Sequence, residues 1–114
     1  MATIQGVAPS MIANNLDPAY PTHPGEVLKD EIAYRSISQR QLAAGMRVSY
    51  TQLNEVLNGK RPVNAEFALL VEAVLDLPAE PLLKMQARYN MIVSKRNGKF
   101  LEKLNKIRNA AAMF

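Results

Sequence analysis

The chain has no cysteine and no tryptophan, and it contains a single histidine. Without cysteine there is no disulfide framework and no thiolate metal site, which favours a reducing cytoplasm. No run of about 18 apolar residues is present, and the N-terminus lacks the basic start and apolar centre of a signal peptide. We therefore expect a soluble cytoplasmic protein that does not associate with a membrane.

Residues that common catalytic centres require are also scarce. The one histidine, His23, lies where a helix is predicted to begin, and a capping or packing role explains it better than catalysis. Asp30 and Glu31 are adjacent and point to different sides of a helix, which suits solvation rather than shared acid–base chemistry. There is no glycine-rich phosphate loop, His-Glu-x-x-His motif or cysteine cluster. The sequence therefore predicts no enzyme, no metal site and no cofactor.

Positive charge is concentrated in two parts of the chain. Its 114 residues carry a net charge of +4 and suffice for one helical domain with a tail. Residues 35–61 hold five cations and one anion, residues 94–114 hold six cations and one anion, and residues 1–34 and 62–93 are net acidic. Basic segments separated by acidic ones favour a polyanionic partner with a defined docking face, although the basic tail also fits a solvated helix face.

Two serines each precede a short helical pattern. Ser38 is followed by Gln41 and Ser49 by Gln52, so each pair forms a Ser-x-x-Gln motif. In this motif the serine oxygen accepts from a backbone amide of the first turn and the glutamine reaches back. The apolar residues after each cap share one side of a helix, and Val48 is placed to close the turn between the two helices. The inward residues are Leu42, Ala43 and Met46 in the first helix and Leu53, Val56 and Leu57 in the second.

This arrangement predicts a helix-turn-helix whose second helix enters the major groove of DNA. Residues 38–59 resemble the lambda-repressor-like helix-turn-helix. Two departures from that family are Arg47, where a glycine is usual in the turn, and Leu82-Leu83, where relatives commonly have an aromatic residue. We expect Arg47 to adopt the left-handed backbone conformation at a modest cost, or the turn to differ slightly.

The segments that flank the helix-turn-helix narrow the resemblance to the HigA antitoxins of bacterial toxin–antitoxin operons. Together with residues 38–59 they extend it over about residues 23–93. The two flanking segments are His23-Pro24-Gly25-Glu26-Val27-Leu28 and Gln86-Ala87-Arg88-Tyr89.

Helical spacing predicts four more helices. Pro24 favours a helix that ends near Tyr34, Asn64 is placed to cap another, and Asn97-Gly98 is typical of a turn before the last helix. The predicted inward faces are Val27, Leu28 and Ile32; Phe67, Ala68, Leu70, Val71, Val74 and Leu75; Leu82, Met85, Tyr89 and Ile92; and Leu101, Leu104, Ile107 and Ala111.

The predicted fold is all-α: a lambda-repressor-like helix-turn-helix bundle of about five helices plus an additional C-terminal helix. We predict a flexible N-terminal arm at residues 1–21, a helix-turn-helix DNA-binding domain at residues 22–95 and a C-terminal amphipathic helix within residues 96–114. The apolar residues of the arm either become ordered against a partner protein or fold over the domain.

The polar face of the second helix supplies the predicted DNA contacts. Thr51 offers a hydroxyl and a methyl group to a base, and Asn54 offers a bidentate pair to adenine. Glu55 either accepts from a cytosine amino group or braces a nearby arginine, while Gln39 either braces the helix or touches a phosphate. The full set of predicted DNA-binding residues is Gln39, Ser49, Tyr50, Thr51, Asn54, Glu55, Asn58, Lys60 and Arg61.

The resemblance implies a DNA-binding antitoxin that represses its own operon and neutralises a HigB-like toxin, a ribosome-dependent mRNA endonuclease. One helix-turn-helix covers one half-site, so we expect a homodimer on an inverted-repeat operator in the bacterial nucleoid, with its seam at the fifth or the last helix. Two alternatives remain: a stand-alone transcriptional regulator without a toxin, and a protein-interaction module that no longer binds DNA. A toxin-sized reading frame beside the gene favours the antitoxin over the regulator.

Overall fold

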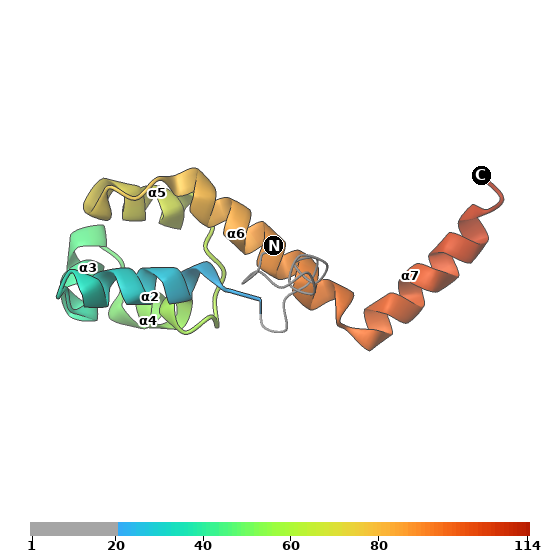
Figure 1. Ribbon diagram of the computed structural model, residues 1–114, viewed down its shortest axis with the longest axis horizontal. Coiled ribbons are helices and arrows are strands. Elements are labelled where there is room, and N and C mark those ends of the chain that lie inside the picture. The colour runs from blue at the N-terminus through green and yellow to red at the C-terminus, as the bar shows by residue number, and fades with distance from the viewer. Residues whose placement is uncertain (1–20) are drawn as a thin grey trace, which may run out of the picture. The chain divides into compact units, whose positions relative to one another are not determined.

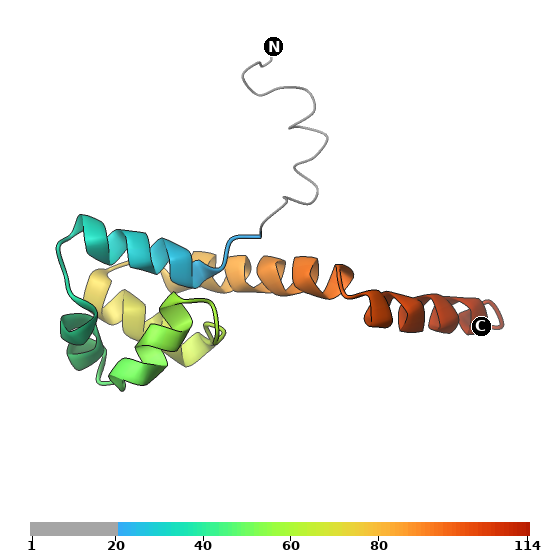
Figure 2. The ribbon, with the colours of Figure 1, turned by 90° about the horizontal axis from the view of Figure 1, so that it is seen from below.

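A computed structural model describes residues 21–114, so residues 1–20 of the predicted arm lie outside the described part of the chain. The described residues are helical and include no strand. The helices are α2 (Pro24–Tyr34), α3 (Gln39–Met46), α4 (Tyr50–Leu57), α5 (Ala65–Leu75), α6 (Ala79–Lys95) and α7 (Gly98–Ala111), as drawn in Figures 1 and 2. The predicted all-α fold, with a last helix beyond the helix-turn-helix bundle, is confirmed.

Helices α2 and α3 begin at complete capping boxes. The Nδ1 atom of His23 accepts from the Gly25 amide at 2.9 Å, and the Glu26 carboxylate accepts from the His23 amide at 3.1 Å. At α3, the Ser38 hydroxyl accepts from the Gln41 amide at 3.0 Å, and the Gln41 side chain accepts from the Ser38 amide at 2.8 Å. Each box satisfies amide groups that a helix start leaves unpaired.

The turn between α3 and α4 is held by backbone bonds and by one half of the second predicted box. Arg47 has φ 58° and ψ 41°, so the expectation of a left-handed, mildly strained residue is confirmed. The amide of Val48 donates to the Ala43 carbonyl at 3.1 Å, and the Val48 side chain packs against the core as predicted. The Ser49 hydroxyl accepts from the Gln52 amide. The second hydrogen bond of the predicted box, from the Ser49 amide to the Gln52 side chain, is absent from the described part of the chain.

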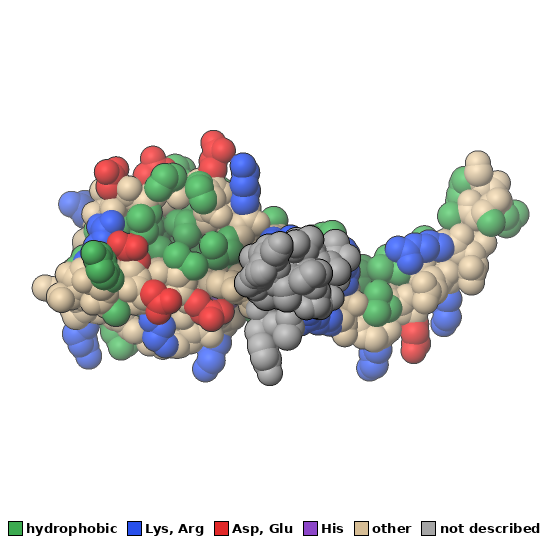
Figure 3. All heavy atoms as spheres, in the orientation of Figure 1, with side chains coloured by type: hydrophobic (Ala, Val, Ile, Leu, Met, Phe, Trp, Pro, Cys, Tyr) green, Lys and Arg blue, Asp and Glu red, His purple; other side chains and the backbone are tan. Residues whose placement is uncertain are grey.

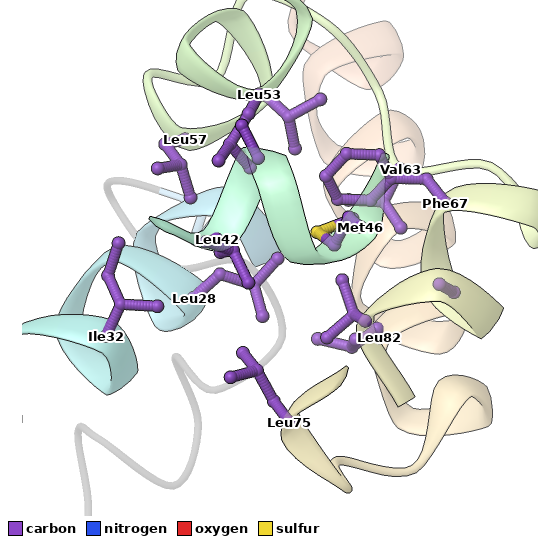
Figure 4. Close-up of a cluster of buried hydrophobic side chains, with 14 of the residues drawn as sticks. Leu28, Ile32, Leu42, Met46, Leu53, Leu57, Val63, Phe67, Leu75 and Leu82 are labelled. Carbon is purple, nitrogen blue, oxygen red and sulfur yellow. The ribbon is translucent and has the colours of Figure 1, made fainter. Parts of the chain in front are cut away.

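The hydrophobic core is formed by the inward faces of α2, α3, α4 and α5 and by the first residues of α6. Figure 4 shows the labelled side chains converging on one interior. Helix α3 packs against both α4 and α5, and Figure 1 shows α5 and α4 along opposite edges of the bundle with α3 at one end. The largest fully buried side chains are Leu28, Leu42, Met46, Leu53, Leu57, Leu75, Val56, Val71 and Pro24.

The first turn of α2 lies directly against the end of α4. A Cβ atom added at Gly25 would lie 1.9 Å from the carbonyl oxygen of Val56 and 2.9 Å from its carbonyl carbon. Both are backbone atoms, so no side chain can rotate away to make room. This contact therefore requires glycine, and it fixes the position of the α4 backbone relative to α2.

In α2 and α5, three residues that were predicted to face inward are exposed. Val27 in α2 is 36% exposed, and Leu70 and Val74 in α5 are 37% and 41% exposed. These residues flank the buried stripe of their helices, and nothing in the described chain covers them fully. The turn predicted at Asn97-Gly98 lies one residue earlier, at Arg96-Asn97: α6 ends at Lys95, Asn97 caps α7 by accepting from the Phe100 amide at 3.0 Å, and Gly98 is already helical.

The chain divides into two compact units. One comprises residues 22–91, and the described residues 92–114 belong to the other. The inward face predicted for the last helix is wrong for the described chain, because α7 buries none of Leu101, Leu104, Ile107 and Ala111. The domain boundaries given above stay predictions. Within residues 21–114 no helix has both the length and the apolar character that crossing a membrane requires.

Candidate nucleic-acid interface

The exposed side of α4 carries the side chains that were predicted to meet DNA bases. The inward residues Leu53, Val56 and Leu57 are buried, which fixes the opposite side of the helix toward solvent. Thr51 is exposed in the first turn, and Tyr50 beside it is 42% exposed. The first turn of α4 therefore offers polar groups on an open surface, as a recognition helix does.

Asn54 is held in place by a residue of the preceding helix. Its Nδ2 atom donates to the Oε1 atom of Gln39 at 3.0 Å, and the pair is partly buried. The sequence left two roles open for Gln39, bracing the helix or touching a phosphate, and in this structure Gln39 braces α4. Because the bond uses one of two amide hydrogens, Asn54 keeps one donor and its Oδ1 acceptor, which is the pair that an adenine edge requires.

Arg40 was absent from the predicted DNA-binding residues, yet it lies at this surface. Its guanidinium carbon is 4.9 Å from the centre of the Tyr50 ring, the geometry of a cation–π contact. The contact joins the first turn of α3 to the first turn of α4 and places a cation over the Tyr50 ring. The preceding residue, Gln39, was predicted to lie at the DNA-binding surface, which pointed to this part of α3. The contact between Arg40 and Tyr50 depends on how α3 and α4 cross, which the sequence does not show.

Glu55 and Arg61 form an ion pair at the other end of α4. The Nη2 and Nε atoms of Arg61 donate to one carboxylate oxygen of Glu55 at 2.6 and 3.0 Å. Glu55 therefore braces an arginine in this structure, which was one of its two predicted roles. Both side chains are at least 38% exposed, so the pair contributes little to stability and either partner can turn to another ligand.

Asn58 follows α4 and joins it to α2. Its Nδ2 atom donates to the Asn54 carbonyl at 2.9 Å, and its Oδ1 atom accepts from the ammonium group of Lys29 at 3.1 Å. The Asn58 side chain therefore caps the C-terminal end of α4 and is not positioned to bind a phosphate. Lys29, which the sequence reasoning missed, adds a cation beside Asn58 at the end of α4. Twenty-nine residues separate Lys29 from Asn58, and no local pattern predicts that contact.

The loop that carries Lys60 and Arg61 is held by the cap of α2. His23 is 3% exposed, and Gly59 lies next to its ring, where an added Cβ would be in ordinary van der Waals contact at 3.7 Å. Burial lowers the pKa of His23 below its ordinary value of 6.5, while the Glu26 carboxylate and a hydrogen bond to the Arg61 backbone act in the opposite direction. The neutral ring accepts at Nδ1, so its proton lies on Nε2.

Helix α6 also holds this loop, through Gln86 and Tyr89. The Gln86 side chain is 5% exposed and accepts from the Val63 amide at 2.8 Å. The Tyr89 ring meets the His23 ring edge to face, with centroids 4.9 Å apart. Both segments that flank the helix-turn-helix in the sequence therefore position the loop after α4, and neither is a site of its own.

The predicted residues do not all contribute in the same way. Thr51, Asn54 and Lys60 present polar groups to solvent, Gln39 and Asn58 act as braces, and Ser49 is the cap of α4. Within the described residues no three histidine, cysteine or acidic side chains converge as metal ligands would. The arrangement is a rigid polar surface with four nearby cations: Lys29, Arg40, Lys60 and Arg61.

Comparison with known proteins places this geometry in a family. A helix-turn-helix family model matches residues 35–82. The structure of an addiction module antidote protein of the HigA family from Coxiella burnetii is 31% identical, with a TM-score of 0.66 over 74% of this chain and 94% of that chain. The chain belongs to the HigA family. The Pseudomonas aeruginosa antitoxin HigA, solved with the higBA promoter, is 30% identical with a TM-score of 0.65, over 73% of this chain and 92% of that one.

Membership in the HigA family confirms the predicted helix-turn-helix family and places the chain among regulators and antitoxins rather than enzymes. A curated relative is virulence-associated protein I of Dichelobacter nodosus, 29% identical over 76 residues, which are 66% of this chain and 70% of that protein. The individual DNA-contacting residues of this HigA-family chain stay predictions.

Proposed function

We propose that this protein is an antitoxin that binds the operator of its own operon through α4, represses that operon and neutralises a HigB-like mRNA endonuclease. It acts as a homodimer in the bacterial cytoplasm, because one recognition helix covers a single half-site and tight binding to an inverted repeat needs two. The half-sites then lie about 34 Å apart on one face of the duplex.

The observation that carries the proposal is the braced polar surface of α4. Asn54 is oriented by Gln39, Thr51 is exposed beside it, and cations stand at both ends of the helix. Fixed polar groups flanked by cations suit a duplex, because base contacts give specificity and phosphate contacts give affinity. A HigA relative of known structure was solved with promoter DNA, which supports the same use of this surface.

Binding to the protein's own promoter tests the DNA half of the proposal. We expect Thr51→Ala to weaken binding to the operator by about 1–3 kcal/mol and to relax the preference for it over unrelated DNA. Lys60→Ala should instead weaken all duplexes alike and reduce the salt dependence by roughly one phosphate contact. Titrations at several salt concentrations separate the two effects. If no salt-sensitive binding to the promoter is found, both the antitoxin and the stand-alone regulator are excluded.

The toxin half is tested at the neighbouring gene. A small reading frame whose product arrests growth, and whose arrest this protein relieves on co-expression, is the expected result. A regulator without a toxin would bind the promoter and relieve no such arrest, so the two experiments together distinguish the antitoxin from the first alternative.

A further inference from the structure

Helix α5 exposes an apolar face that the described chain leaves uncovered. Leu69 is 59% exposed, and Leu70 and Val74 are 37% and 41% exposed. Leu70 and Val74 are four residues apart and lie on the same side of the helix, next to Gly45 of α3, where an added Cβ would lie 3.4 Å from Val74. Adjacent large apolar side chains that remain in water are typical of a surface that binds another protein.

This face has an acidic border. Glu66 lies one turn before Leu70, and Asp76 ends α5 in the left-handed conformation; both are exposed. No lysine or arginine occurs from residue 62 to residue 83, although the chain as a whole carries a net charge of +4. Figure 3 shows hydrophobic side chains gathered beside α5 and acidic side chains along its outer edge.

We propose that the exposed face of α5 is the surface that binds the basic toxin, and that it does so while α4 remains on the operator. This inference rests on the proposed function, which supplies a partner that cleaves mRNA on the ribosome. Such a partner has to approach polyanionic RNA, so it carries positive charge on its own surface. An apolar centre with an anionic border matches that charge and steers the encounter.

Other occupants fit this surface less well. Nucleic acid is repelled by the acidic border and finds no cation on α5. A second copy of the chain in a two-fold dimer would place the same patch against itself, so that Glu66 and Asp76 meet like charges. A basic protein is the occupant that both the apolar centre and the border accept.

The position of α5 makes simultaneous binding possible. Helix α3 packs against both α4 and α5, and Figure 1 shows α5 and α4 along opposite edges of the bundle, so their exposed sides lie on different edges of residues 22–91. The toxin therefore adds to the protein–operator complex instead of displacing the DNA.

Two matched pairs of substitutions in the full-length protein test the surface. Leu70→Lys and Glu66→Lys change the α5 face, and Tyr34→Lys and Asp30→Lys make the same kinds of change at exposed positions of α2. The probe is the purified product of the reading frame beside the gene, with affinity measured by calorimetry. We expect Leu70→Lys to weaken binding roughly thirtyfold or more, because it puts an ammonium group at the apolar centre. Glu66→Lys should weaken binding more at low salt than at high salt, and the α2 pair should change neither the affinity nor its salt dependence.

Folding is checked in the same samples, because operator binding and the melting temperature should be unchanged in the α5 variants. Adding the toxin product to the protein–operator complex should give a larger complex that still holds DNA. If the wild-type protein fails to bind the neighbouring product, the toxin half of the proposed function is wrong. If the wild-type protein binds it and the α5 variants bind equally well, only the assignment of this surface is wrong. Conversion of a dimer into monomers by Leu70→Lys would also overturn it, because a second copy would then cover the face.

Discussion

Helices α2 and α7 have nearly the same local signals and quite different surroundings. Each begins at a capping side chain, His23 for α2 and Asn97 for α7, and each has a glycine in its first turn. Helix α2 buries Pro24, Gly25, Leu28 and Ile32, whereas α7 buries none of its residues. The difference shows that local signals decide where a helix begins, while tertiary contacts decide how much each of its residues contributes to stability.

The glycines give the largest expected contrast. Gly25→Ala should destabilise the bundle by at least about 3 kcal/mol, because its Cβ would overlap the Val56 carbonyl and push α2 away from α4. Gly98→Ala is the matched control, since no atom lies within 4 Å of the added Cβ, and alanine should favour α7 by up to about 1 kcal/mol. Chemical denaturation of the two variants measures both values. Equal stabilities would mean that the α2–α4 contact does not need glycine.

The two caps give the second contrast. His23→Ala removes the cap, the ring contact with Tyr89 and the bond to the Arg61 backbone, and should destabilise the bundle by about 2–3 kcal/mol. Asn97→Ala removes only a cap bond, worth about 1 kcal/mol, and this loss should be confined to α7. Hydrogen exchange resolves the helices separately. A global loss of protection in Asn97→Ala would contradict the comparison.

A smaller effect concerns pH, and it is confined to the α2 cap. Because burial lowers the pKa of His23 in the folded protein, the unfolded chain binds a proton more readily than the folded chain does. Stability should therefore be full above pH 6.5, fall as the pH drops below 6.5 and level off below the folded pKa. Thermal unfolding of the wild type and of His23→Asn, which can cap but cannot titrate, checks this. The same slope in both proteins would exclude His23 as its cause.

The smallest effect is expected on the outer face of α2. Arg35 and Glu31 form an ion pair at 2.7 Å, but both side chains are about one-third exposed. Glu31→Gln should cost at most about 0.5 kcal/mol, and the cost should disappear in high salt. A loss above about 1 kcal/mol in a denaturation series would show that this pair is not an ordinary surface pair.

Much of the fold was predictable because helix starts depend on local patterns. The caps at Ser38, Ser49 and Asn64 lie at the predicted positions, and α2 has its predicted limits. Periodicity indicates the centre of a buried face but not its edges, so Leu70 and Val74 were wrongly expected inside.

The candidate site was predictable in its position and not in its contacts. The spacing of α4 indicated which side faces solvent. The contacts of Asn58 with Lys29, Val63 with Gln86 and Tyr50 with Arg40 join residues far apart in the sequence or on different helices, so they depend on how the helices cross. The same holds for His23, whose cap was predicted but whose contact with Tyr89 was not.

The bond between Gln39 and Asn54 has a consequence for how operator preference changes over generations. A substitution at position 54 alone leaves the partly buried Gln39 oxygen without its donor, and a substitution at position 39 alone leaves Asn54 unoriented. Residues that share such a bond have non-additive effects. A duplicated copy of this gene that acquires a new operator should therefore change both positions together, and the paired change should be tolerated better than either single one.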